Sequence, residues 1–430
     1  MAESDLRPLP GTKGTTGILE ALAFFRDPDF AKSRFERYGN VFETSLFGQS
    51  MVFIQGGKAI ADLLSHPEAI EGWWPESVKL LLGSYSLANR NGSSHKARRR
   101  VVAQLFSASA LQRYSPSIIN MVQELSDEFR TAKMPIPLAE RMRRFAFSVI
   151  ASTVLGLEGS EYDELFSDFE IWTKALFSIP IALPGSPFAK ALKARKRLLE
   201  RLTDVISQPL KGRGGLDLIV GSLDEVGIPL TDDDLVEQLL LLLFAGYETT
   251  ASALSCLMRE LLLNPSVERW LREEIDHLCW PPSPENATTA YELANAPKLD
   301  ALISEVMRLT PPVGGFFRRT KCPIVIDGVL VPENRVVQVA LAASNRHGVG
   351  DLEIFRPQRH LEDDCSVTLM PFGYGERICL GKALAELEIR LMVVGLFRNL
   401  RLAVIPNQNF TLKQLPSPTP SDGLLVKVQN

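Results

Sequence analysis

A cysteine stands between a glycine-rich turn and a helical pattern in the segment PFGYGERICLGKALAELEIR, residues 371–390. The apolar residues after Cys379 recur at helical spacing, so the cysteine lies at or just before a helix N-terminus. Exposed amide groups and the helix dipole favour an anion at such a position. Gly373, Gly375 and Gly381 permit close backbone approach and unusual dihedral angles. Together these features would stabilise a thiolate that binds a metal.

The other cysteines do not suggest a different use of sulfur. The chain contains five cysteines, which are scattered and form no Cys-x-x-Cys pair. A disulfide framework or a structural zinc site is therefore not expected. A buried free cysteine is most often an inert small hydrophobe. That reading suits the other four, and for Cys379 it competes with metal binding.

The residues around Cys379 resemble the haem-binding signature of the cytochrome P-450 family, Phe-x-x-Gly-x-Arg-x-Cys-x-Gly. All defined positions match, at Phe372, Gly375, Arg377, Cys379 and Gly381. The resemblance implies a haem b cofactor whose iron is bound by Cys379, with Phe372, Gly373 and Gly381 in the surrounding loop. A cysteinate on haem iron pushes electron density onto the iron and favours O–O cleavage.

A second group lies in AGYETT, residues 245–250, inside an apolar stretch that predicts one long helix over residues 232–263. A Thr hydroxyl can donate to a carbonyl one turn earlier and bend a helix, so a kink with a paired acid is one reading. The segment also resembles the family's oxygen-activation motif, Ala/Gly-Gly-x-Asp/Glu-Thr, where the helix opens over the haem. That resemblance implies that Glu248 and Thr249 deliver protons during catalysis.

A third motif is SEVMR, in which Glu305 and Arg308 lie three residues apart on a predicted helix. Such a pair usually occupies a solvated face. The later segment FRPQRH resembles the family's Phe-x-Pro-x-Arg segment, with His360 where the family often has an aromatic residue. The resemblance implies a buried structural triad of Glu305, Arg308 and Arg359, because buried charges must be paired.

Haem carries two carboxylate groups, which need cationic partners. Arg377, Arg318 in PPVGGFFRRT, and the pair His95 and Arg99 in HKARRRVV resemble family positions that bind them. The alternative for the last stretch is a solvated helix face, in which other basic residues form a surface for an acidic redox partner: Lys96, Arg98 and Arg100.

The segments RLTPPVGGFFR and LLLLLFAGYETTASAL look like the branch of the family that contains retinoic-acid hydroxylases and their soluble cyanobacterial relatives. This implies a monooxygenase for an apolar substrate, a retinoid or another isoprenoid, with electrons from a separate ferredoxin or flavoprotein reductase. Two alternatives stay open: a peroxide-driven peroxygenase or hydroperoxide isomerase, and a non-catalytic haem protein. By family placement the pocket would be lined by Trp73, Trp74, Phe177, Phe244, Ala245, Val313, Gly314 and Phe316.

Composition limits the other partners. Of the 430 residues, 47 are Lys or Arg and 51 are Asp or Glu, so the net charge of −4 argues against nucleic acid. The acidic start lacks the pattern of a signal peptide. The longest aliphatic run, residues 239–244, is too short to span a bilayer, so no transmembrane anchor is expected. We expect a soluble cytoplasmic monomer, and peripheral membrane contact stays open.

The elements that position these residues are mostly helical. We expect a mainly α (α+β) chain of the P-450 fold, a large helical domain with small sheets that spans residues 1–430. The helical patterns cover residues 107–132, 139–155, 186–206, 232–263, 266–278, 299–309 and 380–400. The strand patterns cover residues 41–46, 51–54, 324–326, 329–331 and 336–340.

Overall fold

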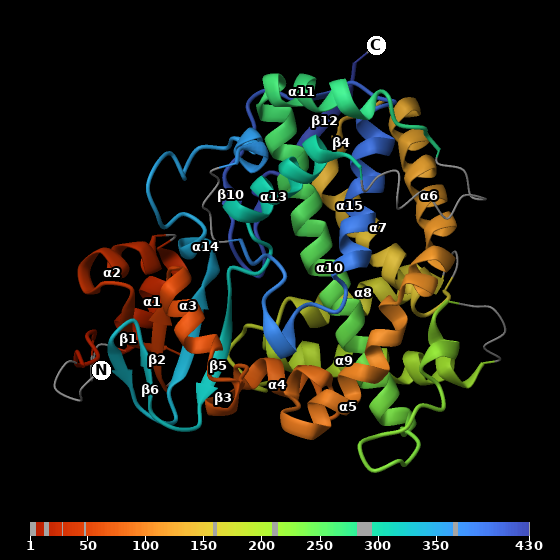
Figure 1. Ribbon diagram of the computed structural model, residues 1–430. Coiled ribbons are helices and arrows are strands. Elements are labelled where there is room, and N and C mark those ends of the chain that lie inside the picture. The colour runs from red at the N-terminus through yellow and green to blue at the C-terminus, as the bar shows by residue number, and fades with distance from the viewer. Residues whose placement is uncertain are drawn as a thin grey trace. The chain divides into compact units, whose positions relative to one another are not determined.

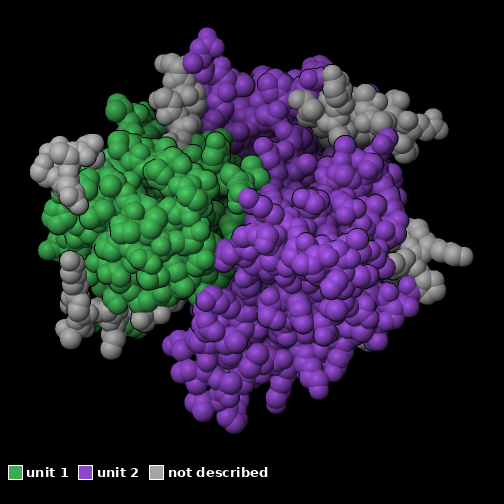
Figure 2. All heavy atoms as spheres, turned by 60° about the horizontal axis from the view of Figure 1, so that its bottom comes forward, with its two compact units in different colours: residues 1–75, 307–355, 364–378 green, residues 76–306, 356–363, 379–430 purple. Residues whose placement is uncertain are grey.

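The computed structural model describes residues 6–12, 17–27, 29–46, 49–157, 161–208, 214–281, 295–363 and 369–429. The chain divides into two compact units, which Figure 2 colours separately. Unit 1 contains residues 1–75, 307–355 and 364–378, and unit 2 contains residues 76–306, 356–363 and 379–430. The expectation of a single domain stays a prediction, because compactness does not show whether either unit folds alone.

Unit 1 is built on a five-stranded sheet of order β1-β2-β8-β5-β3 (Figure 1). Strands β2 and β8 run parallel, and the other neighbours are antiparallel. Successive residues of β2 alternate between two apolar clusters, as the period of a strand requires: Val52 and Ile54 lie in one, Met51 and Phe53 in the other. The strands are β1 (Val41–Leu46), β2 (Gln49–Ile54), β3 (Ile70–Gly72), β5 (Gly315–Thr320) and β8 (Val336–Ala340).

A separate hairpin in unit 1 follows from a local sequence signal. Strands β6 (Ile324–Ile326) and β7 (Val329–Val331) are joined by Asp327 and Gly328. Both of these residues have positive φ, 46° and 74°, as a two-residue hairpin turn requires. The helices of this unit are α1 (Gly17–Arg26), α2 (Phe30–Tyr38), α3 (Gly57–Leu64), α14 (Leu341–Ser344) and the short η2 (Pro67–Ala69) and η7 (Gly375–Arg377).

Unit 2 is organised around the long helix α10 (Asp232–Leu263), which packs against α7 (Leu138–Thr153), α9 (Pro187–Ser207) and α15 (Lys382–Phe397). Its N-cap residue Thr231 accepts a hydrogen bond from the Asp234 amide at 3.2 Å. Within the part of the chain that the structure describes, α10 alone is long and apolar enough to cross a membrane, and most of that apolar window is buried inside the protein.

The remaining elements of unit 2 surround these helices. They include α4 (Glu76–Leu82), α5 (Gly92–Ala103), α6 (Ala108–Thr131), α8 (Glu161–Thr173), α11 (Pro265–Ile275) and α13 (Pro297–Leu309), whose last turn enters unit 1. Short helices are η3 (Leu87–Asn89), η4 (Gln104–Phe106), η5 (Leu216–Leu218) and η6 (Pro357–Leu361). One small sheet has the order β4-β12-β9, and another pairs β10 with β11. These strands are β4 (Ile136–Pro137), β9 (Leu402–Val404), β10 (Leu412–Lys413), β11 (Thr419–Pro420) and β12 (Leu425–Val428).

The predicted elements are confirmed in type and mostly in bounds. The prediction for α10 agrees at both ends, and the other predicted helices differ from α6, α7, α9, α11, α13 and α15 by at most three residues at either end. The predicted strands correspond to β1, β2, β6, β7 and β8. Strands β3, β4, β5 and β9 to β12 were not predicted, although β5 occupies an inner position in the sheet of unit 1.

Candidate active site

Cys379 lies between the short helix η7 and the first turn of α15. Gly373 and Gly375 have φ of 73° and 68°, so the expected unusual dihedrals are confirmed there. The expectation is wrong for Gly381, the N-cap residue of α15, whose φ is −81°. A Cβ at Gly381 would only reach ordinary contact distance, 3.9 Å from Cys379 Sγ. The loop therefore needs glycine for its bends before the cysteine, not after it.

The Cys379 thiol is accessible by surface area. Nevertheless, burial raises its pKa, and the Gly381 amide and Arg99 only partly offset this effect. The amide at this helix terminus favours the thiolate, as expected, but its effect is smaller than that of burial. A bound metal cation would supply the missing stabilisation, because a coordinating thiol is deprotonated outright.

Cys379 can supply one ligand to a metal, so it suits a metal whose other ligands come from a cofactor. In the described ranges, no three His, Cys, Asp or Glu side chains gather into a possible metal site. A single accessible thiol fits a haem, whose porphyrin nitrogens complete the coordination of iron.

Arg318 and Arg377, in unit 1, carry positive charge that an anion would balance. Arg318 donates to the Phe317 carbonyl at 2.8 Å and lies 4.6 Å from the centre of the Phe316 ring. Burial and the charge of Arg377 lower the pKa of Arg318 to about 10. A Cβ at Gly72 would lie 2.4 Å from Cζ of Arg377, so the absence of a side chain there leaves room for the guanidinium. The two carboxylates of a haem fit such a pair of cations. Phe372 and Gly373 belong to the same unit and are half-buried.

Helix α5, in unit 2, presents its basic residues to different surroundings. His95 is buried, Arg99 is half-buried, and Lys96 and Arg100 are exposed. Burial lowers the pKa of Arg99, while the charge of Cys379 acts in the opposite direction, so the two groups lie within electrostatic reach. Arg98 is only 2% exposed, so its assignment to a basic surface is wrong.

The centre of α10 carries the expected acid and alcohol. Thr249 Oγ1 donates to the Ala245 carbonyl one turn earlier, at 2.6 Å. The helix continues through this segment without interruption, so the opening implied by the family resemblance is not seen. Gly246 lies against α7, because a Cβ there would come 2.2 Å from Ile150. Packing against α7 thus accounts for the glycine.

Glu248 is buried, with an exposed fraction of 7%. Thr250, two residues later, is buried as well, with an exposed fraction of 2%. Burial raises the pKa of Glu248, Arg143 on α7 lowers it, and Glu170 on α8 raises it further. A carboxyl with a raised pKa holds its proton more readily than an exposed one, which is the direction required of a proton donor.

Glu305 accepts hydrogen bonds on both carboxylate oxygens although it is fully buried. Arg359 Nε donates at 3.0 Å and the Arg356 amide at 2.8 Å, both to Oε1. His360 Nε2 lies 2.9 Å from Oε2. The histidine that departs from the family pattern is therefore a direct partner of Glu305, which the sequence did not reveal.

Arg308 is also fully buried, and its guanidinium contacts main-chain carbonyls of unit 1. Nη1 donates to Asn345 at 3.0 Å and to Leu352 at 2.6 Å. Arg308 therefore anchors the segment that follows α14. A solvated face, the default reading for Glu305 and Arg308, is wrong for both residues.

The predicted pocket residues have different surroundings. Trp73 packs into a core cluster of unit 1, with its ring 5.3 Å from that of Phe317. Val313 is exposed, and a Cβ at Gly314 would meet no atom within 4 Å. In unit 2, Ala245 is exposed. The others are half-buried: Trp74, Phe177, Phe244 and Phe316. Trp73 is thus a core residue, and the others offer apolar surface.

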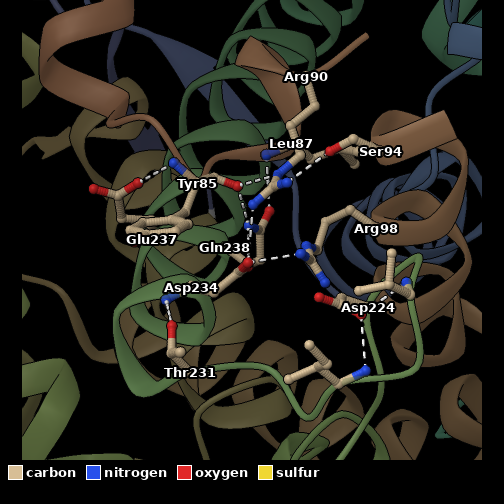
Figure 3. A network of polar contacts seen from close by, with 12 residues as sticks. Tyr85, Leu87, Arg90, Ser94, Arg98, Asp224, Thr231, Asp234, Glu237 and Gln238 are labelled. Carbon is tan, nitrogen blue, oxygen red and sulfur yellow. Dashed lines mark hydrogen bonds and ion pairs between the residues drawn. The ribbon is translucent and has the colours of Figure 1, made fainter. Parts of the chain in front are cut away.

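The polar start of α10 carries interactions that the sequence analysis missed. Asp234, Glu237 and Gln238 are all buried and face the segment that precedes α5 (Figure 3). The sequence signal was present, because the helix begins with the polar sequence DDDLVEQ before its apolar stretch.

Comparison with known proteins agrees with this geometry. A family model described as Cytochrome P450 matches residues 28–428. A protein of Synechocystis sp. named putative cytochrome P450 120 is 34% identical over 435 residues, which cover 98% of this chain and 96% of that protein. Cytochrome P450 26B1 of Danio rerio is 32% identical over 97% of this chain and 86% of its own length. A solved structure described as retinoic acid bound cyanobacterial CYP120A1 superposes with a TM-score of 0.90 at 33% identity, over 99% of both chains.

Proposed function

We propose, from the premise that this chain belongs to the cytochrome P450 family, that it hydroxylates an apolar isoprenoid, and that a retinoid is the first substrate to test. Family membership makes the protein a haem-thiolate monooxygenase of the P450 fold, with a small substrate and a redox partner. The observation that carries the substrate proposal is the likeness to a structure with bound retinoic acid over 99% of both chains.

Cys379 is the proposed ligand of the haem iron, and Arg318, Arg377, His95 and Arg99 are the proposed partners of the haem carboxylates. When bound, the haem supplies the iron at which dioxygen is activated and from which oxygen reaches the substrate. The protein must hold the sulfur as a thiolate, which burial alone disfavours. Binding of the iron cation would therefore favour the thiolate, and binding of the haem carboxylates would balance the positive charge of the arginines.

Glu248 and Thr249 are the proposed proton-delivery pair. Thr249 Oγ1 already donates to the Ala245 carbonyl, so its lone pairs can accept a hydrogen bond from a water. Burial keeps a proton on Glu248 at a higher pH than an exposed carboxyl would. An acid that gives up this proton to water and a hydroxyl that orients that water together form a relay.

The substrate is expected to contact apolar side chains. Val313 and Ala245 are accessible although such residues are often buried, and Gly314 leaves open space beside the backbone. Such surfaces favour a polyene chain or an isoprenoid ring over a polar substrate. We further propose that the exposed Lys96 and Arg100 of α5 contribute to the binding of an acidic ferredoxin or flavoprotein.

Spectral titration tests the substrate class. Retinoic acid, retinol and retinal, with fatty acids, other terpenoids and steroids as comparison series, are added to the oxidised protein, and the spin state of the haem is followed. We expect a retinoid to give the largest shift at the lowest concentration. Absence of a shift with every retinoid, together with tight binding of another series, would reject the retinoid.

Turnover experiments test the reaction type. Product formation that requires dioxygen and a generic electron-transfer pair supports the monooxygenase. Product formed with hydrogen peroxide or an organic hydroperoxide alone, at an undiminished rate, would instead show a peroxygenase or an isomerase.

A further inference from the structure

Three polar side chains in the first two turns of α10 bind the segment that leads into α5 (Figure 3). Gln238 accepts a hydrogen bond from the Leu87 amide at 2.9 Å and donates to the Tyr85 carbonyl at 2.6 Å. Glu237 accepts from the Tyr85 amide at 2.7 Å. Asp234 completes the row, and its exposed fraction is only 4%. Polar groups are rarely buried at the start of an apolar helix unless their partners are fixed.

The Asp234 carboxylate joins α10 directly to α5. Its Oδ2 lies 2.7 Å from Nη2 of Arg98 and accepts from Nη2 of Arg90 at 2.9 Å. Its Oδ1 accepts from Nε2 of Gln238 at 2.9 Å. Both arginines point toward Asp234 in Figure 3. Because Arg98 is almost completely buried, it cannot leave this carboxylate without stranding a charge inside the protein.

The contact between Arg98 and Asp234 fixes the rotation of α5. Consecutive residues of a helix point about 100° apart, so the direction of Arg98 sets the directions of its neighbours. With Arg98 against α10, Lys96 and Arg100 are exposed, and Arg99 is half-buried on the side within electrostatic reach of Cys379. His95, four residues before Arg99, lies on the same face of the helix and is buried.

We propose that Asp234, acting through Arg98, is a positioning residue that directs Arg99 and His95 of α5 toward the carboxylates of the haem. This inference rests on the haem-binding role proposed above for α5, and it assigns Asp234 a task in holding the cofactor. Apolar contacts such as those of Val101 and Val102 bury the helix but tolerate small rotations. A short ion pair between two buried side chains specifies one rotation.

The test compares the holoenzyme with Asp234→Asn, Arg98→Gln and the double variant. The rate of haem transfer to excess apomyoglobin and the reduction potential of the haem are measured without substrate. Each single variant should lose haem about tenfold faster, as expected when a charge-assisted hydrogen bond is lost. The double variant should resemble either single variant, because both substitutions remove the same constraint.

The reduction potential separates positioning from a simple charge effect. If the two residues acted only through space, Asp234→Asn would raise the potential, because it removes a negative charge, and Arg98→Gln would lower it. If they position Arg99, a cation moves away from the haem in both variants, so both should lower the potential. A raised potential in Asp234→Asn, or haem loss at the rate of the unsubstituted protein, overturns the inference.

Two further variants keep the test decisive if those proteins fold poorly. Arg98→Lys retains the charge but loses the planar fork, so positioning predicts faster haem loss and a lower potential, and a charge effect predicts neither. Glu237→Gln is the matched control, because Glu237 pairs with Arg195 and the Tyr85 amide but not with α5. It should leave haem retention unchanged. Haem loss in Glu237→Gln as fast as in Asp234→Asn would also overturn the inference. These measurements do not depend on substrate, so a failure of retinoid turnover would leave them unaffected.

Discussion

Replacement of Thr249 by alanine should leave the folded protein nearly unperturbed. The hydroxyl makes one hydrogen bond, to the Ala245 carbonyl within its own helix, at 2.6 Å. Such a neutral bond contributes about 1 kcal/mol net, and alanine regains about half of that through its higher helix propensity. The free energy of unfolding should therefore change by less than about 1 kcal/mol. Haem content, spin-state shifts and electron uptake should persist.

The same substitution should uncouple electron use from product formation. Loss of one oriented hydroxyl removes a hydrogen bond of about 1 kcal/mol, equivalent to about a fivefold change in the ratio of product to hydrogen peroxide. Removal of a positioned proton donor can cost 10²- to 10⁴-fold in proton transfer, so about fivefold is the smallest expected change. Product formed per reductant consumed should fall accordingly, and peroxide should rise.

The assay measures product, peroxide and reductant consumption together in Thr249→Ala, Thr249→Ser and Thr250→Ala. Serine keeps the hydroxyl and should restore most of the coupling. Thr250 is 2% exposed and points about 100° away from Thr249 around the helix, so its replacement should change coupling little. Unchanged coupling in Thr249→Ala, or an equal loss in Thr250→Ala, would refute the assignment of Thr249.

Three other substitutions test separate parts of the structure. Cys379→His should abolish the red-shifted absorption band of the reduced carbon-monoxide complex, and survival of that band would exclude Cys379 as the iron ligand. Arg359→Ala should lower the free energy of unfolding, measured in urea, by about 3–5 kcal/mol, because it removes a charged partner of the buried Glu305. The control is Arg130→Ala, which breaks an exposed ion pair and should lower that free energy by less than about 1 kcal/mol. Glu388→Gln should raise the melting temperature at pH 8 more than at pH 4.

Local signals account for the elements that the sequence predicted well. The bounds of α10 follow from the cap at Thr231 and from Pro265, which starts the next helix. The hairpin at Asp327 and Gly328 needs only the positive φ that these residue types tolerate. Each of these features depends on neighbours within a few positions, so a single sequence is sufficient to predict it.

Pairings between distant residues account for what the sequence did not predict. Strand β5 carries Arg318 and Arg319 and lacks a simple apolar alternation, and it is recognisable as a strand only once it pairs with β8 and β3. Arg98 likewise resembles a surface residue until its partner Asp234, on another helix, is known. The Cys379 signature could be recognised because its residues are contiguous, whereas the partners of Glu305 and Asp234 come from separate segments.

Glu388 is a buried carboxyl that the sequence pattern did not reveal, and its environment determines the pH dependence predicted above. It lies at an inward position of α15, and its Oε2 has no hydrogen-bond partner among the described residues. Burial raises the pKa of Glu388 well above the ordinary value of 4.5.

Below pH 4.5 the carboxyl is protonated in both the folded and the unfolded chain, so it adds no pH dependence. As the pH rises above 4.5, the unfolded chain releases the proton and the folded chain retains it, so the free energy of unfolding falls. Glutamine is neutral at every pH and escapes this loss, so the advantage of Glu388→Gln in melting temperature should grow from pH 4 to pH 8. The exposed Glu124→Gln on α6 controls for the substitution itself. An advantage that stays constant with pH would show that Glu388 is ionised in the folded protein.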